Sequence, residues 1–114
     1  MRVLAFEDSV DIEALLISGG VDLSKYEFIQ YWDSQMFLAR ILEFSPDILM
    51  LDHYMPPTCG LDVLKALLAT QIQRPQTIIA MSSDSMANYA MLNAGADVGI
   101  LKHQVPELEL WNQS

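Results

Sequence analysis

Short apolar runs alternate with longer segments of helical periodicity along the whole chain, and this alternation constrains the fold more than any other feature. The runs that we predict to be strands are Arg2–Phe6, Tyr26–Tyr31, Asp47–Leu51, Gln76–Met81 and Asp97–Leu101. The segments that we predict to be helices are Ser9–Ile17, Asp33–Phe44, Leu61–Thr70, Ser85–Ala94 and Val105–Trp111. Such regular β–α alternation indicates a parallel sheet with helices on both faces.

The length of the chain favours one domain. A chain of 114 residues has the common size of a single domain, so we predict one domain over residues 1–114. At this length the pattern predicts a flavodoxin-like, doubly wound α/β fold, (βα)5, with a five-stranded parallel sheet in the order 2-1-3-4-5 and a short last helix. Ser9 is the expected N-cap of the first helix, and Asp33 or Ser34 that of the second.

Composition narrows the class of protein. No apolar run approaches the roughly 18–20 residues of a membrane helix, and the N-terminal run is too short for a secretory signal. We therefore expect a cytoplasmic protein. Cys59 is the only cysteine, which rules out an internal disulfide, and no neighbouring residue resembles a base that would activate its thiol. A net charge of −9 argues against nonspecific binding to nucleic acid.

The residues whose side chains could bind a ligand or react follow directly after the predicted strands. Glu7 and Asp8 follow the first strand, Asp52 the third, Ser82 and Ser83 the fourth, and Lys102 the fifth. In a doubly wound sheet, ligands bind beyond the carboxyl ends of the strands, where the strand order reverses. The sequence therefore predicts one site at this edge of the sheet.

Three neighbouring carboxylates require a cation or a shared proton, because they repel one another. Mg²⁺ fits Glu7, Asp8 and Asp52, since it prefers oxygen ligands and keeps several waters. Lys102 could then contribute a point charge toward a phosphate, and the Ser82 hydroxyl a hydrogen bond. A carboxylate such as Asp52 can act as a nucleophile and form an aspartyl phosphate.

These residues resemble the pattern of the receiver domains of bacterial response regulators in two-component signalling, and the resemblance covers essentially the whole chain. The matching positions are the acidic pair Glu7-Asp8, then Asp52, Met55, Pro56 and Gly60 within LMLDHYMPPTCGLDVL, then Ser82, Ala94-Gly95-Ala96 and Lys102. Each motif is weak alone, whereas all of them in order and at family-like spacing form a specific signal.

The resemblance implies a stand-alone receiver whose Asp52 accepts a phosphoryl group from a histidine kinase or histidine phosphotransfer protein. It implies that Mg²⁺ is bound by Glu7, Asp8, Asp52 and the backbone carbonyl of Tyr54, and that Ser82 and Lys102 contact the phosphoryl group. Such a protein signals by contact with a downstream protein, which the sequence does not identify, and not through nucleic acid or a membrane. It is not an enzyme beyond slow self-dephosphorylation. A homodimer is left open.

Four positions are expected to tune this chemistry or its output, namely His53, Ser83, Gly99 and His103. Gly99 stands where the family usually has an aromatic residue, and His103 follows Lys102 where the family usually has proline. The last helix must also be short. All three departures fall on the face through which the family usually signals. We therefore expect intact phosphorylation chemistry with a modified signalling face, or a phosphate sink.

Three other functions remain as alternatives. A pseudo-receiver would use the fold for binding without phosphorylation. A flavodoxin-like cofactor binder would need a Ser-, Thr- or Gly-rich loop after the first strand, where Glu7 and Asp8 would repel a phosphate. A phosphatase with an aspartate nucleophile usually carries a second aspartate two residues later, and that residue is Tyr54 here.

Overall fold

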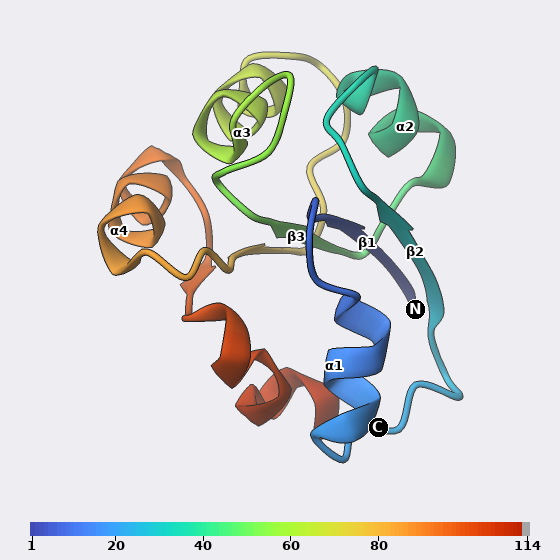
Figure 1. Ribbon diagram of the computed structural model, residues 1–114. Helices are drawn as coiled ribbons and strands as arrows, with labels where there is room; N and C mark the ends of the chain where they lie inside the picture. The colour runs from blue at the N-terminus through green and yellow to red at the C-terminus, as the bar shows by residue number, and fades with distance from the viewer. Residues whose placement is uncertain (113–114) are drawn as a thin grey trace.

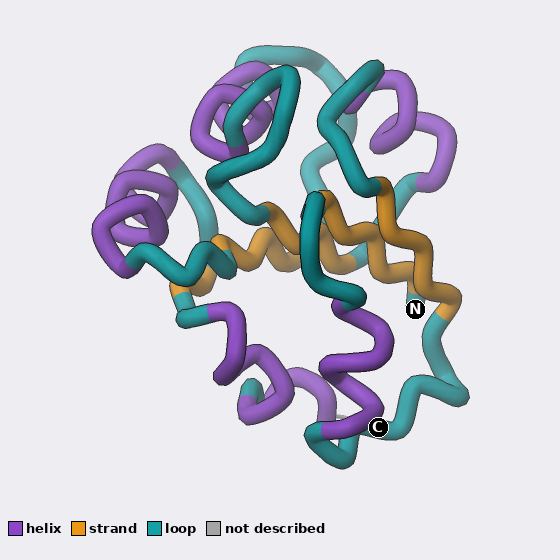
Figure 2. The backbone as a smooth tube through the Cα atoms, viewed as in Figure 1, coloured by secondary structure: helices purple, strands orange, loops and turns teal. Residues whose placement is uncertain are grey.

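A five-stranded parallel sheet lies at the centre of the computed structural model, which describes residues 1–112 (Figures 1 and 2). The strand order is β2-β1-β3-β4-β5. The strands are β1 Arg2–Phe6, β2 Glu27–Tyr31, β3 Ile48–Leu51, β4 Thr77–Ala80 and β5 Val98–Gly99. The α-helices are α1 Ile12–Ser18, α2 Phe37–Phe44, α3 Gly60–Leu68 and α4 Ser85–Ala94. The predicted fold class and strand order are confirmed.

The central strands are apolar on both faces because helical layers cover both sides of the sheet. Alternate residues of β1, β3 and β4 therefore enter two separate cores. Leu4, Leu49 and Ile78 pack in the core beneath α2, α3 and α4. Val3 and Met50 pack in the other core, with α1 and the C-terminal segment. Figure 1 shows α2, α3 and α4 on one side of the sheet and α1 with the C-terminal segment on the other.

The register brings the carboxyl ends of the three central strands to one level. Phe6 pairs with Leu51 between β1 and β3, and Leu51 pairs with Ala80 between β3 and β4. The residues that follow these strands therefore emerge side by side.

Helices α1 and α2 begin later than the sequence predicts, and the prediction that Ser9, Asp33 or Ser34 caps them was wrong. Asp11 caps α1, with its side chain accepting a hydrogen bond from the Ala14 amide (3.1 Å). The Ser9 amide and hydroxyl instead donate to the Glu7 carboxylate (3.0 and 3.3 Å).

The segment before α2 also departs from the prediction. The Ser34 side chain is buried and hydrogen bonded to the Thr58 backbone in both directions (2.7 and 2.8 Å). The Asp33 carboxylate accepts from Arg40 (2.9 Å), and Met36, with a left-handed backbone (φ 52°), precedes α2 without a side-chain cap. Ser34 is thus engaged by the loop after β3, and Asp33 by a side chain of α2, so neither caps the helix amides.

The predicted last α-helix is replaced by two 3₁₀ helices, η1 Lys102–Glu107 and η2 Glu109–Asn112. Pro106 within η1 has no amide proton to donate, and Leu108 between the two turns is extended (φ −65°, ψ 134°). Trp111 closes the core by donating from its indole to the Val105 carbonyl (2.9 Å).

The last strand is shorter than predicted, since β5 covers only Val98–Gly99. The pairing continues for one further bond, from the Ile100 amide to the Ala80 carbonyl (2.9 Å). Among the described residues, no helix has the length and apolar character needed to cross a membrane.

Candidate functional site

The residues at the carboxyl ends of the strands converge as the sequence predicts. Carboxylate oxygens of Glu7, Asp8 and Asp52 all lie within 4.8 Å of one another. Beside them is an open hollow of about 440 Å³. Its lining residues are Asp8, Ser9, Asp52, Tyr54, Ser82, Ser83, Asp84 and Lys102.

Asp52 is held directly after β3, at the base of this hollow, and only 3% of it is exposed. Its Oδ2 atom lies 3.6 Å from Lys102 Nζ. Its Oδ1 atom is buried and has no hydrogen-bond partner within residues 1–112. Burial, reinforced by the neighbouring Glu7, raises the pKa of Asp52 to about 6, although Lys102 acts in the opposite direction. The carboxylate is therefore ionised at neutral pH but poorly stabilised.

Glu7 is fully buried, and unlike Asp52 it accepts hydrogen bonds on both of its carboxylate oxygens. Its Oε1 atom accepts from Lys102 Nζ (2.9 Å), and its Oε2 atom accepts from the Ser9 and Val10 amides. Burial alone favours the neutral acid, but Lys102, the neighbouring Asp52 carboxyl and the two amides together outweigh it and lower the pKa of Glu7. Glu7 is thus the ionised partner that holds Lys102 against the site.

Lys102 and Ser82 complete the site from the last two strands. The Lys102 side chain is 12% exposed and touches both buried carboxylates. Ser82 is fully buried, and its Oγ atom accepts from the Asp84 amide (3.1 Å). That bond uses an oxygen lone pair, so the hydroxyl proton stays free for another acceptor.

The remaining predicted positions lie around the hollow or beyond it. Asp8 and Ser83 are exposed and line it. His53 is partly buried, with its Nδ1 atom accepting from the Leu61 amide (3.4 Å). Gly99 and His103 are exposed and belong to β5 and η1.

Sequence reasoning missed two polar residues beside this site, Asp84 and Asn88. The Tyr54 hydroxyl donates to the Asp84 carboxylate (2.6 Å), which joins the loop after β3 to the loop after β4 across the hollow. Asn88 is buried in α4 and hydrogen bonded to the backbone of Ser82 (2.7 and 2.9 Å). A signal for Asn88 was available, because helical spacing places it on the same face as buried Met91.

The donor set fits a divalent cation with oxygen ligands. Asp8 is exposed, and Asp52 Oδ1 is a buried oxygen with no partner in the part of the chain that the structure describes, so both have lone pairs available to an ion. Glu7 fits less directly, because Lys102 and two amides already use its oxygens. Asp8 and Asp52 are therefore the better candidates for direct ligands.

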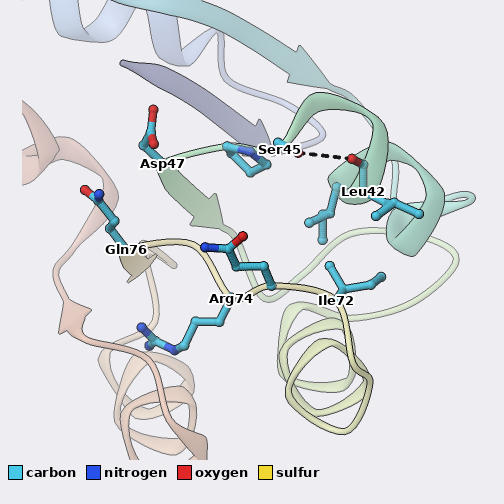
Figure 3. Close-up of a pocket in the computed structure, with 9 residues that line it drawn as sticks. Leu42, Ser45, Asp47, Ile72, Arg74 and Gln76 are labelled. Atoms are coloured by element: carbon cyan, nitrogen blue, oxygen red, sulfur yellow. Dashed lines mark hydrogen bonds between the residues drawn. The ribbon is translucent and has the colours of Figure 1, made fainter.

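A second hollow, of about 380 Å³, lies at the opposite edge of the sheet, where β3 and β4 begin (Figure 3). Its charged side chains already have structural partners. The Asp47 carboxylate accepts from the Arg2 amide (2.8 Å), and Arg74 is paired with Asp97 (2.8 Å). Nothing in this hollow resembles a reactive group.

Comparisons with known proteins agree with this fold. No protein-family model matches the chain. The chain is 34% identical over 101 residues to the transcriptional regulatory protein PrrA of Mycobacterium leprae, a match that covers 89% of the chain and 43% of PrrA. The chain thus spans less than half the length of this relative.

Solved structures share the whole fold. The response regulator domain of Thermotoga maritima CheB superposes with a TM-score of 0.72 at 22% identity, covering 99% of this chain and 86% of that one. The BeF3-activated N-terminal receiver domain of Klebsiella pneumoniae RstA gives 0.75 at 23% identity, covering 98% and 94%.

Proposed function

This chain is a homologue of response regulators with the fold of their receiver domains, and from that premise we propose that Asp52 accepts a phosphoryl group. The donor is a histidine kinase or a histidine phosphotransfer protein. The observation that carries the proposal is the buried carboxylate of Asp52, in a hollow that Ser82 also lines. Its Oδ1 atom has no hydrogen-bond partner among residues 1–112, and its Oδ2 atom lies 3.6 Å from Lys102 Nζ. A nucleophile, a cation and a hydroxyl donor face one open hollow.

The chain's own residues supply most of the chemistry. An Asp52 oxygen attacks the phosphorus of a phosphohistidine, forming an O–P bond while the N–P bond breaks. The electron pair leaves with the imidazole nitrogen, which then takes up a proton. Lys102 offsets negative charge on the transferring group, and the free proton of Ser82 can be donated to one of its oxygens. Mg²⁺ held by Asp8, Asp52 and the Tyr54 carbonyl, with Glu7 beside it, would neutralise further phosphoryl charge.

Signalling then depends on contact with another protein. The 114 residues carry a net charge of −9, which disfavours a direct role for this domain in binding nucleic acid. PrrA is named as a transcriptional regulator, and most of its length lies outside the match, so DNA remains a partner for any whole regulator that contains such a domain. The expectations of a stand-alone, cytoplasmic and non-enzymatic protein stay predictions.

Intact mass spectrometry tests the proposal. The protein is incubated with acetyl phosphate, with and without Mg²⁺, beside Asp52→Asn and the matched control Asp62→Asn. Asp62 is an exposed carboxylate in the first turn of α3. We expect a Mg²⁺-dependent gain of one phosphoryl group in the wild type and in Asp62→Asn, and none in Asp52→Asn.

An alternative outcome favours the pseudo-receiver. If the folded wild type gains nothing from acetyl phosphate or from a phosphorylated histidine phosphotransfer protein, phosphorylation is not its function. Gain of the group by Asp52→Asn would place the phosphoryl group on another residue.

A further inference from the structure

One buried side-chain amide connects two strand ends that border the site. Asn88 lies in α4, is 4% exposed, and bonds only to backbone groups. Its Oδ1 atom accepts from the Ser82 amide (2.7 Å), and its Nδ2 atom donates to the Ser82 carbonyl (2.9 Å). The Asn88 side chain therefore holds both the backbone amide and the backbone carbonyl of Ser82.

The same amide also reaches the last strand. Asn88 Nδ2 donates its second proton to the carbonyl of Ile100 (3.0 Å), two residues before Lys102. The backbone pairing of β4 with β5 has ended here, since its last bond runs from the Ile100 amide to Ala80. Asn88 thus continues the connection between the strand that leads to Ser82 and the strand that leads to Lys102.

Gly99 of β5 lies beside Leu92 and Asn88 of α4. A Cβ atom at position 99 would lie 2.8 Å from Leu92 Cδ1 and 3.5 Å from Asn88 Cβ. The Leu92 Cδ1 atom is the end of an exposed side chain that can rotate away, and 3.5 Å is an ordinary van der Waals distance. The Asn88 bonds therefore do not depend on the absence of a side chain at Gly99.

We propose that Asn88 is a positioning residue that fixes the Ser82 backbone, so that the free proton of the Ser82 hydroxyl is directed to the phosphoryl group. The inference rests on the proposed phosphorylation of Asp52. The Ser82 Oγ atom already accepts from the Asp84 amide, and Asn88 holds the peptide groups on both sides of the Ser82 Cα atom. Together these bonds leave the hydroxyl little freedom except rotation of its proton.

The substitution Asn88→Asp tests this role with little change of shape. The aspartate keeps an acceptor for the Ser82 amide, but places an oxygen where Nδ2 faces two carbonyls. Asn93→Asp is the matched control, because Asn93 is exposed on the same helix and the change adds the same charge. Phosphorylation is followed by intact mass over a series of acetyl phosphate concentrations with Mg²⁺.

We expect Asn88→Asp to lower the maximal phosphorylation rate by about tenfold, because small displacements of a contacting group have large effects on rate. The donor concentration for half-maximal rate changes less, and Asn93→Asp stays within about twofold of the wild type. In a Ser82→Ala background, Asn88→Asp has little further effect, because the hydroxyl it positions is absent. A full tenfold loss in that background would overturn the proposal, since a general loss of structure would act regardless of Ser82.

Amide hydrogen exchange without phosphodonor separates this inference from the proposed function. We expect the Ser82 amide to lose protection in Asn88→Asp, because the Ser82 and Ile100 carbonyls repel the new oxygen and displace the side chain from the amide. The amide should keep its protection in Asn93→Asp. Unchanged protection would overturn the positioning role. A wild type that gains no phosphoryl group would overturn the proposed function, whereas normal phosphorylation of Asn88→Asp would overturn only the inference. If Asn88→Asp does not fold, Asn88→Ser and Asn93→Ser are compared in the same way.

Discussion

Two buried carboxylates share one ammonium group, yet their environments move their pKa values in opposite directions. Glu7 lies 2.9 Å from Lys102 and also accepts from two backbone amides, so its pKa is lowered. Asp52 lies 3.6 Å from Lys102 and has one oxygen without a partner among residues 1–112, so burial raises its pKa to about 6. The fold therefore assigns the structural ion pair to Glu7 and leaves Asp52 available for chemistry.

The raised pKa of Asp52 predicts a more stable variant. From pH 3.8, the ordinary pKa, to about 6, the folded state holds a proton on Asp52 more tightly than the unfolded state does. The contribution of Asp52 to the free energy of unfolding is therefore fully present below pH 3.8 and is lost as the pH rises toward about 6. The loss is about 3 kcal/mol at neutral pH. We expect Asp52→Asn to unfold with a free energy roughly 1–3 kcal/mol higher at pH 7, since the amide also resists burial.

Urea denaturation without divalent cations measures this effect. The advantage of Asp52→Asn is expected to shrink toward zero near pH 4, where Asp52 is protonated in the folded wild type. Asp62→Asn, on the exposed face of α3, serves as the control and should stay close to the wild type. A less stable Asp52→Asn protein at neutral pH would contradict the raised pKa.

At the scale of elements, the start of α3 packs directly against the backbone of Asp52 and His53. The Gly60 amide donates to the His53 carbonyl (2.8 Å), and α3 begins at Gly60. A Cβ atom there would lie 2.1 Å from the Asp52 carbonyl oxygen. Only glycine permits this approach, so the position of α3 and that of Asp52 depend on each other.

Gly60→Ala is therefore expected to lower the unfolding free energy by about 2–4 kcal/mol, because overpacking against backbone forces the helix or the strand end to move. Gly20→Ala is the contrasting variant. Gly20 has a φ of 89° and no atom within 4 Å of its Cβ position, so we expect only the backbone cost of about 1 kcal/mol. Equal losses in urea denaturation would mean that contact with Asp52 does not determine the effect.

The sequence predicted the strands and the polar residues that follow them because apolar runs in a parallel sheet are local signals. Asp52, Ser82 and Lys102 could be placed because strand ends in one sheet share an edge. The starts of α1 and α2 could not be predicted, since Ser34 bonds to Thr58 and Ser9 to Glu7 rather than to helix amides.

The contacts that tune the site were equally hidden from the sequence. Tyr54 meets Asp84 and Asn88 meets Ser82 only after the loops have been placed. The closing 3₁₀ helices follow from Pro106 and from the packing of Trp111, which a helical pattern of apolar residues does not distinguish from an α-helix.

At the scale of the whole molecule, an acidic cluster sits within a chain that already carries a net charge of −9. Any salt screens the general repulsion and stabilises the fold. A bound ion adds a separate contribution that grows with its concentration relative to its Kd, about 2.7 kcal/mol at a hundredfold excess. Ionic strength and site binding can therefore be separated.

We expect MgCl2 to raise the thermal unfolding midpoint of the wild type more than NaCl does at the same ionic strength. Asp8→Asn should abolish the excess while keeping the response to NaCl, because Asp8 is exposed and its carboxylate belongs to the cluster. Asp62→Asn removes one charge elsewhere and should keep the excess. If Asp8→Asn and Asp62→Asn respond alike, Mg²⁺ acts on the molecule only through its net charge, and the ion has no specific site among the three carboxylates.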